Sequence, residues 1–193
     1  MHSKSKFNMN TLIIHPQDPT TTFLEPIYSA LDVKTVITGG KTREEVHELI
    51  ADHDHILMCG HGSPYGLFSI SQFPGLGYSG YVIDQSAIKY LKTKKVTTIW
   101  CFAEQFVRNS GLTNTYFSDM FISEVQEGLL MGLTEVSDEM VEESNHCFSS
   151  DLAEHIMQAP EVMHEKMQSG AYARLAQTNP VATYNFRRLN YVK

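Results

Sequence analysis

Short apolar runs alternate with amphipathic segments along the first half of the chain, and this alternation limits the fold more than any other feature of the sequence. The runs at 11–15, 34–38, 55–59 and 96–102 have the length and composition of buried strands. The segments between them carry helical spacing, and an alternation of strand and helix is typical of a parallel sheet. We therefore predict an α/β fold, a three-layer sandwich in which helices flank a mainly parallel sheet.

Capping and turn residues divide the rest of the chain. Thr42 and Glu45 have the spacing of a capping box, so a helix is predicted from there to about residue 51. The stretch 65–80 is rich in Gly, Ser and aromatic residues and is predicted to be a long loop or a small hairpin. Further helices are predicted at 23–31, 85–91, 118–130 and 137–158, and further strands at 81–84 and 181–192.

Length, charge and cysteine content narrow the class of protein. The 193 residues fit a single domain, with residues 1–10 as a flexible N-terminus. The formal charge of -7 gives no reason to expect nucleic-acid binding, because phosphate recognition needs clustered Lys and Arg. No apolar run has the length of a leader peptide or a membrane span, and three cysteines form no disulfide framework. We expect a cytoplasmic protein that does not associate with membranes.

Two residues with complementary chemistry follow strands of the predicted sheet. His61 comes directly after the run 55–59, and Cys101 closes the run 96–102. Open parallel sheets bind ligands beyond the carboxyl ends of their strands, so the two side chains face one crevice if these strands are neighbours. A thiolate is a nucleophile, and a nearby imidazole takes its proton or lowers the thiol pKa. The pair predicts acyl transfer with Cys101 as nucleophile and His61 as base.

Acyl transfer also needs hydrogen-bond donors for the oxyanion that forms on the substrate. Gly62 follows His61 and has no side chain, so its backbone N–H is free to face a substrate. The N–H of Cys101 is the second predicted donor.

The residues around His61 and Cys101 form two blocks about forty residues apart. The first block reads ILMCGHGS at 56–63, and the second reads VTTIWCFA at 96–103. An apolar strand that ends in His-Gly, followed by one that ends in Cys, resembles the caspase–gingipain–legumain group of cysteine peptidases (clan CD). The resemblance spans about residues 10 to 133, and Gly66-Leu67 is similar to an element of the related CHAT-type domains. The residues beside Cys101 match no single subfamily.

The resemblance implies a caspase-like sheet and a peptide or protein substrate. It gives His61 the role of base, Cys101 that of nucleophile and Gly62 that of an oxyanion donor. We expect no cofactor and no metal.

Acidic residues are the candidates for substrate selection. Several members of this peptidase group prefer a charged residue before the scissile bond, and a carboxylate pocket selects Arg or Lys. Segments that can approach the site carry Asp84, Asp119 and Glu124. The predicted substrate contacts are Ser63, Asp84 and Glu104.

Two other functions remain open at this point. The domain is a catalytically silent peptide-binding or protein-binding module if Cys101 is unreactive, because fold alone does not determine function. The alternative is a metal-dependent hydrolase that uses the histidines at 47, 53, 55 and 61 with Asp52 and Asp54. A strand of six residues separates the two ends of that cluster by roughly 20 Å, which argues against one mononuclear site.

Overall fold

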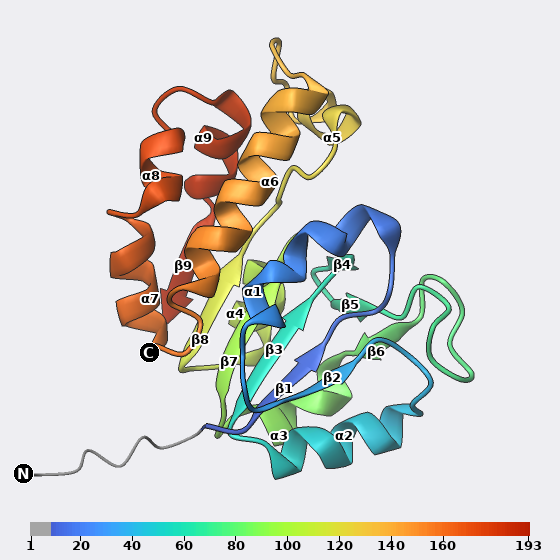
Figure 1. Cartoon of the computed structure of the whole chain (residues 1–193). Coiled ribbons are helices and arrows are strands. Elements are labelled where there is room, and N and C mark those ends of the chain that lie inside the picture. Colours follow the sequence, from blue (N-terminus) through green and yellow to red (C-terminus); the bar gives the residue numbers. More distant parts are fainter. Residues whose placement is uncertain (1–8) are drawn as a thin grey trace, which may run out of the picture.

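The computed structural model describes residues 9–193, and its centre is a six-stranded sheet (Figure 1). The strand order is β2-β1-β3-β7-β8-β9, in which the first five strands run parallel and β9 pairs antiparallel with β8. The bounds of the strands are β1 Thr11–Ile14, β2 Lys34–Ile37, β3 His55–Cys59, β7 Lys95–Ile99, β8 Thr115–Ser118 and β9 Leu189–Val192. The predicted α/β fold with a mainly parallel sheet is confirmed.

Helices cover both faces of this sheet. One face packs against α2 and three shorter helices, and the other packs against the N-terminal helices and the C-terminal helical region. The first group comprises α2 Arg43–Asp52, η2 Gln85–Ala87, α3 Ile88–Leu91 and α4 Ala103–Ser110. The second comprises η1 Pro19–Leu24, α1 Pro26–Ser29, α6 Asp138–Ala153, α7 Pro160–Met167, α8 Ala171–Leu175 and α9 Pro180–Phe186. Apolar side chains of the strands alternate between the two layers, as they must in a sheet that is covered on both sides.

A small antiparallel sheet follows β3. It has the order β4-β5-β6, and its strands are β4 Gly62–Ser63, β5 Gly66–Phe68 and β6 Tyr81–Ile83. The stretch 65–80, predicted as a long loop or small hairpin, supplies β5 and the loop that leads to β6. This sheet begins one residue after His61, so the candidate base lies between the two sheets.

Local signals account for most of the first half. Thr42 accepts a hydrogen bond from the Glu45 N–H, and Glu45 accepts one from the Thr42 N–H, which confirms the capping box of α2. The predicted helix at 23–31 is split instead into η1 and α1. Each of them begins at a proline, Pro19 and Pro26, which fits the first turn of a helix but not its interior.

Two predictions in the second half are wrong in part. The segment 118–130 was predicted as one helix, but it begins with the last residue of β8, and only α5, Val125–Leu130, is helical. The segment 181–192 was predicted as a strand, but its first part lies in α9. Asn179 caps that helix by accepting from the Ala182 N–H, and Pro180 opens it. Helix capping therefore overrides the apparent alternation of apolar and polar residues in this segment, and only its last four residues form β9.

The N-terminal prediction concerns residues 1–10, of which 1–8 lie outside the described residues. The backbone of Asn10 is fixed to the start of β3, since its carbonyl accepts hydrogen bonds from the N–H groups of Asp54 and His55. Within residues 9–193, no helix has both the length and the apolar character needed to cross a bilayer.

Candidate functional site

His61 and Cys101 line the same pocket beyond the carboxyl ends of two adjacent strands. β3 pairs directly with β7, with Cys59 opposite Ile99, so each candidate residue lies two positions past a paired strand end. The pocket has a volume of about 20 Å³, enough for a water molecule but not for a peptide side chain. Its lining consists of Thr21, Phe23, Leu24, Gly60, His61, Ile99, Trp100, Cys101, Phe121 and Ser123.

Cys101 lies in a tight turn and not in a strand. The predicted strand 96–102 ends at Ile99, because Phe102 has φ of 67° and this left-handed conformation cannot continue a strand. Trp100, before the cysteine, is buried and donates its indole N–H to the Ser63 carbonyl at 3.1 Å. Helix α4 begins at Ala103, so the thiol is carried by a turn between a central strand and a helix.

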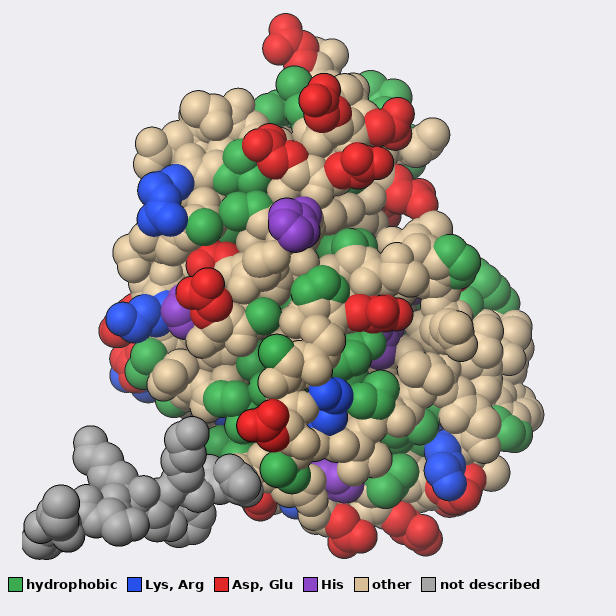
Figure 2. All heavy atoms as spheres, in the orientation of Figure 1, with side chains coloured by type: hydrophobic (Ala, Val, Ile, Leu, Met, Phe, Trp, Pro, Cys, Tyr) green, Lys and Arg blue, Asp and Glu red, His purple; other side chains and the backbone are tan. Residues whose placement is uncertain are grey.

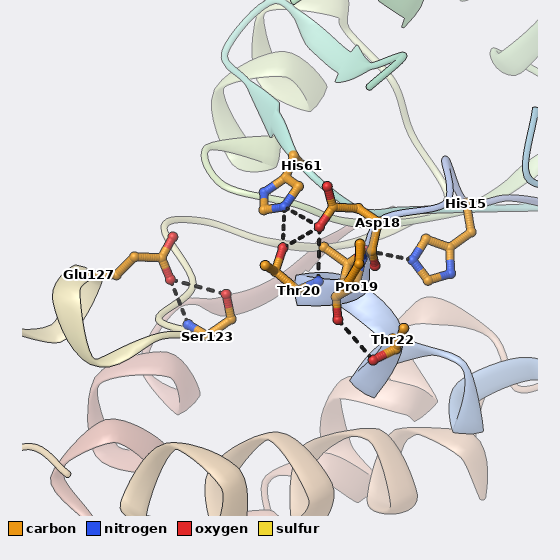
Figure 3. A network of polar contacts seen from close by, with 9 residues as sticks. His15, Asp18, Pro19, Thr20, Thr22, His61, Ser123 and Glu127 are labelled. Carbon is orange, nitrogen blue, oxygen red and sulfur yellow. Dashed lines mark hydrogen bonds and ion pairs between the residues drawn. The ribbon is translucent and has the colours of Figure 1, made fainter. Parts of the chain in front are cut away.

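The imidazole of His61 is held by two polar residues that follow β1 (Figure 3). Its Nε2 lies 2.7 Å from the Thr20 hydroxyl and 3.5 Å from Asp18 Oδ1. The Thr20 hydroxyl is also 2.5 Å from the same carboxylate oxygen. Burial acts to raise the pKa of Asp18, but hydrogen bonds from Thr20 and the nearby His61 outweigh it, and the pKa lies below its usual value.

This network assigns the proton on the imidazole. An ionised carboxylate only accepts hydrogen bonds, so the Thr20 hydroxyl donates its single proton to Asp18. The hydroxyl oxygen of Thr20 must then accept a hydrogen bond from His61. This puts a hydrogen on Nε2 and leaves the lone pair of the neutral ring on Nδ1. His61 is thereby prepared to accept a proton at Nδ1.

The thiol of Cys101 has a different environment. Its Sγ donates to the Phe121 carbonyl at 3.5 Å, and no hydrogen bond or ion pair joins it to His61 among residues 9–193. Burial raises its pKa from 9.0 to about 11, the Phe121 contact lowers it less, and the charges of Glu127 and Asp119 raise it further. The sequence left open whether His61 lowers the pKa of the thiol or takes its proton; the raised pKa of Cys101 does not fit the first of these.

The loop that covers Cys101 is fixed by residues near the C-terminus. The buried side chain of Asn185 accepts from the Ile122 N–H at 2.7 Å and donates to the Ile122 carbonyl at 2.8 Å. The Asp119 N–H donates to the Arg188 carbonyl at 2.9 Å. These contacts on both sides of Phe121 determine where its carbonyl meets the thiol.

The two predicted oxyanion donors differ in their surroundings. The Phe68 N–H bonds the His61 carbonyl, which makes Gly62 and Leu67 a non-hydrogen-bonded pair, so the Gly62 N–H points away from β5. The Cys101 N–H has no protein acceptor within the described part of the chain. Cys101 lines the pocket, whereas Gly62 does not.

The predicted substrate contacts lie outside the pocket. Ser63 bonds the Tyr81 hydroxyl at 2.8 Å, and Asp84 caps η2 through Ser86 and pairs with Arg43 at 3.3 Å. Glu104 pairs with Arg108 along α4 at 2.7 Å. Each has a structural partner that accounts for it.

The histidine cluster does not converge. His53 bonds the Leu49 carbonyl and Thr35, and His55 lies between Thr11 and Thr97 inside the sheet. Within residues 9–193, the three metal-ligating side chains whose ligand atoms lie within 4.8 Å of one another are instead Asp151, Glu154 and His155. Asp151 already accepts the Tyr172 N–H at 2.8 Å, so this group has a structural role in the helical region.

Sequence reasoning missed four residues that shape the site: Asp18, Thr20, Phe121 and Asn185. A signal existed for the first two. They follow β1, whose carboxyl end lies at the same edge of the sheet as those of β3 and β7. Phe121 acts through its backbone carbonyl, and the Asn185 side chain acts on Ile122 from 63 residues away. No local sequence pattern exists for either contact.

Comparisons with known proteins leave the chain unassigned. No protein-family model matches it, and no curated protein matches its sequence. A solved structure of the response regulator RcsB of Salmonella typhimurium aligns with 93% of this chain and 98% of its own, at 13% identity and a TM-score of 0.33. A likeness at this level carries no conclusion about fold or function.

Proposed function

We propose that this chain hydrolyses peptide bonds through Cys101 and His61, on a sheet of the caspase-like type. One observation carries the proposal: a thiol and an imidazole line a single pocket beyond the carboxyl ends of adjacent parallel strands. That edge is where open α/β sheets bind their ligands. A buried cysteine alone would be an ordinary small apolar residue, but the prepared imidazole beside it is not needed for packing.

The reaction divides into two steps. His61 takes the thiol proton at Nδ1 while Cys101 Sγ attacks the scissile carbonyl carbon, and the N–H groups of Gly62 and Cys101 stabilise the oxyanion. The protonated His61 then gives its proton to the leaving amine. A water molecule, deprotonated by His61, hydrolyses the thioester and returns the thiol.

The resting state requires that the proton moves only after the substrate has bound. With a pKa of about 11, the Cys101 thiol is protonated at neutral pH, and a pocket of about 20 Å³ admits no peptide. The loop that carries Phe121 must therefore shift as a substrate enters. Its displacement removes the thiol from its carbonyl acceptor and leaves His61 as the acceptor of the proton.

A second candidate function is a peptide-binding module without catalysis. The raised pKa of Cys101 favours it, because a module needs no reactive thiol. The two candidates share the pocket and differ only in whether a bond is cleaved.

Hydrolysis of a mixed peptide library, followed by mass spectrometry, separates them. Cleavage should disappear in Cys101→Ala and fall about 100-fold in His61→Ala, because general-base assistance contributes at least that much. Cys147→Ala, a half-buried cysteine of α6 away from the pocket, is the matched control and should retain full activity. Cleavage that persists in Cys101→Ala would exclude the peptidase. Peptide binding without cleavage, equal in wild type and Cys101→Ala, would establish the module.

A further inference from the structure

The charges of this chain are distributed unevenly along the sequence. Residues 109–165 contain twelve of the 22 acidic residues and none of the 15 Lys and Arg residues. This stretch therefore carries a formal charge of -12, against +5 for the rest of the protein. Such separation creates a strongly negative surface wherever the stretch is exposed.

The structure gathers part of this charge in one groove. Acidic side chains crowd the end of the molecule where α5 and the beginning of α6 lie (Figure 2; elements in Figure 1). A groove of about 480 Å³ runs between these two helices, and three exposed carboxylates, those of Glu124, Asp138 and Glu142, line it. The remaining lining residues are Ser123, Val125, Gln126, Val141 and Asn145.

A buried acceptor without a donor lies against the same groove. Asn145 is 8% exposed, and its Nδ2 donates to the Ser123 carbonyl at 3.1 Å. Its Oδ1 has no hydrogen-bond partner within residues 9–193. Leaving such an oxygen unpaired costs about 1–3 kcal/mol, so a donor that reached it would stabilise the protein.

The ligand that fits must be cationic, must donate hydrogen bonds and must extend over several carboxylates. The oxygens of Glu124, Asp138 and Glu142 do not all lie within 4.8 Å of one another, which is the wrong arrangement for a single metal ion. Guanidinium and ammonium groups on long side chains bridge such separations and supply N–H donors.

The groove adjoins the candidate active site at one residue. Ser123 lines both the groove and the pocket that holds Cys101 and His61, and it lies two residues from Phe121. A polypeptide bound at the pocket can therefore extend to the carboxylates of the groove. We propose that this groove binds a segment rich in Arg and Lys of the polypeptide on which the site acts. This inference rests on the proposed function and gives it a substrate class, namely basic proteins or peptides.

The test measures binding without catalysis. The full chain carrying Cys101→Ala is titrated into a fluorescein-labelled peptide with Arg at every second position, and binding is followed by fluorescence anisotropy. Adding Glu124→Gln, Asp138→Asn and Glu142→Gln should weaken binding about tenfold. The Gln at 124 keeps an acceptor for the capping box of α5, and removing like charges does not endanger the fold.

A matched control separates the groove from net charge. Asp32→Asn, Glu48→Gln and Asp52→Asn remove three exposed charges outside the acidic stretch and should weaken binding less than about twofold. Equal losses in the two triple variants would overturn the proposal, since net charge alone would then explain the attraction. Displacement of the peptide by about 1 mM calcium at constant ionic strength would overturn it in favour of a cation site.

The outcome is independent of cleavage. Arg-peptide binding that depends on the groove supports the inference even if wild-type protein cleaves nothing, and in that case only the peptidase proposal fails. Cleavage that depends on Cys101 but is indifferent to the groove variants and to Arg in the peptide overturns the inference alone.

Discussion

The two halves of the candidate site are built on opposite principles. His61 is partly exposed and lies within polar contacts, with Thr20 and Asp18 around one ring nitrogen. Cys101 is half-buried in a mainly apolar pocket, donates to a backbone carbonyl and lies near two carboxylates. The base is therefore prepared in advance, while the nucleophile is kept protonated. Reactivity in this arrangement depends on a change at the thiol and not at the imidazole.

The strongest test of this comparison targets the contact that joins the two halves. A Cβ on Gly62 would lie against the Trp100 ring and 2.7 Å from the Gly66 carbonyl oxygen. Gly62→Ala should therefore lower the free energy of unfolding by about 3 kcal/mol, measured by urea denaturation. Gly77→Ala, where a Cβ meets open space, is the control and should have little effect. Equal stability of the two variants would mean that the halves do not pack as described.

The next test asks whether Cys101 is a resting thiol. Its pKa of about 11, against an ordinary 9.0, predicts about 100-fold less thiolate than a free thiol at neutral pH. Alkylation by iodoacetamide, assigned by mass spectrometry, should be correspondingly slow and should still be rising above pH 9. His61→Ala should leave the rate unchanged.

The same titration affects stability in a defined direction. Because the pKa in the folded state exceeds that of the unfolded thiol, Cys101 favours folding fully below about pH 9, and this contribution declines as the pH rises toward about 11. An alkylation rate that levels off near neutral pH and depends on His61 would instead reveal a thiolate–imidazolium pair. The contrast between the two halves would then be wrong.

The smallest expected effect concerns the polar half. Thr20→Val removes the hydroxyl between His61 and Asp18 and should slow peptide hydrolysis about tenfold, as loss of an orienting contact does elsewhere. It should also change the Nε2–H tautomer population of His61 in ¹⁵N NMR spectra. Thr22→Val in the same short helix is the control, since among residues 9–193 the Thr22 hydroxyl bonds only the Pro19 carbonyl. An unaltered tautomer in Thr20→Val would show that Thr20 does not orient the ring.

The sequence predicts those parts of the fold that local chemistry determines. The strands β1 and β3 are largely apolar runs, β2 is a short β-branched run closed by glycines, and the capping box of α2 lies within four residues, so each could be recognised without tertiary information. The two candidate residues could be found for the same reason, because both follow strands.

Prediction fails where distant residues decide the structure. β8 was not predicted and its last residue was placed in a helix, while most of α9 was predicted as a strand, because sheet pairing and capping override local periodicity there. The pKa of Cys101 depends on burial, on the hydrogen bond to the Phe121 carbonyl and on the charges of Glu127 and Asp119, all of which follow from the folded arrangement. Pattern alone could suggest a nucleophile but not its protonation state.

The two hydrogen bonds between the Asn185 side chain and the backbone of Ile122 have a consequence for the order of folding. The carbonyl over the thiol is fixed by a side chain 63 residues further along the chain, close to the last strand. Contacts of such sequence separation form late, because the intervening chain must first be closed into a loop. The strand ends that carry His61 and Cys101 can therefore come together during synthesis before the cover is in place. The thiol remains more open to water on a nascent chain than in the finished protein, and closure of the site is among the last events of folding.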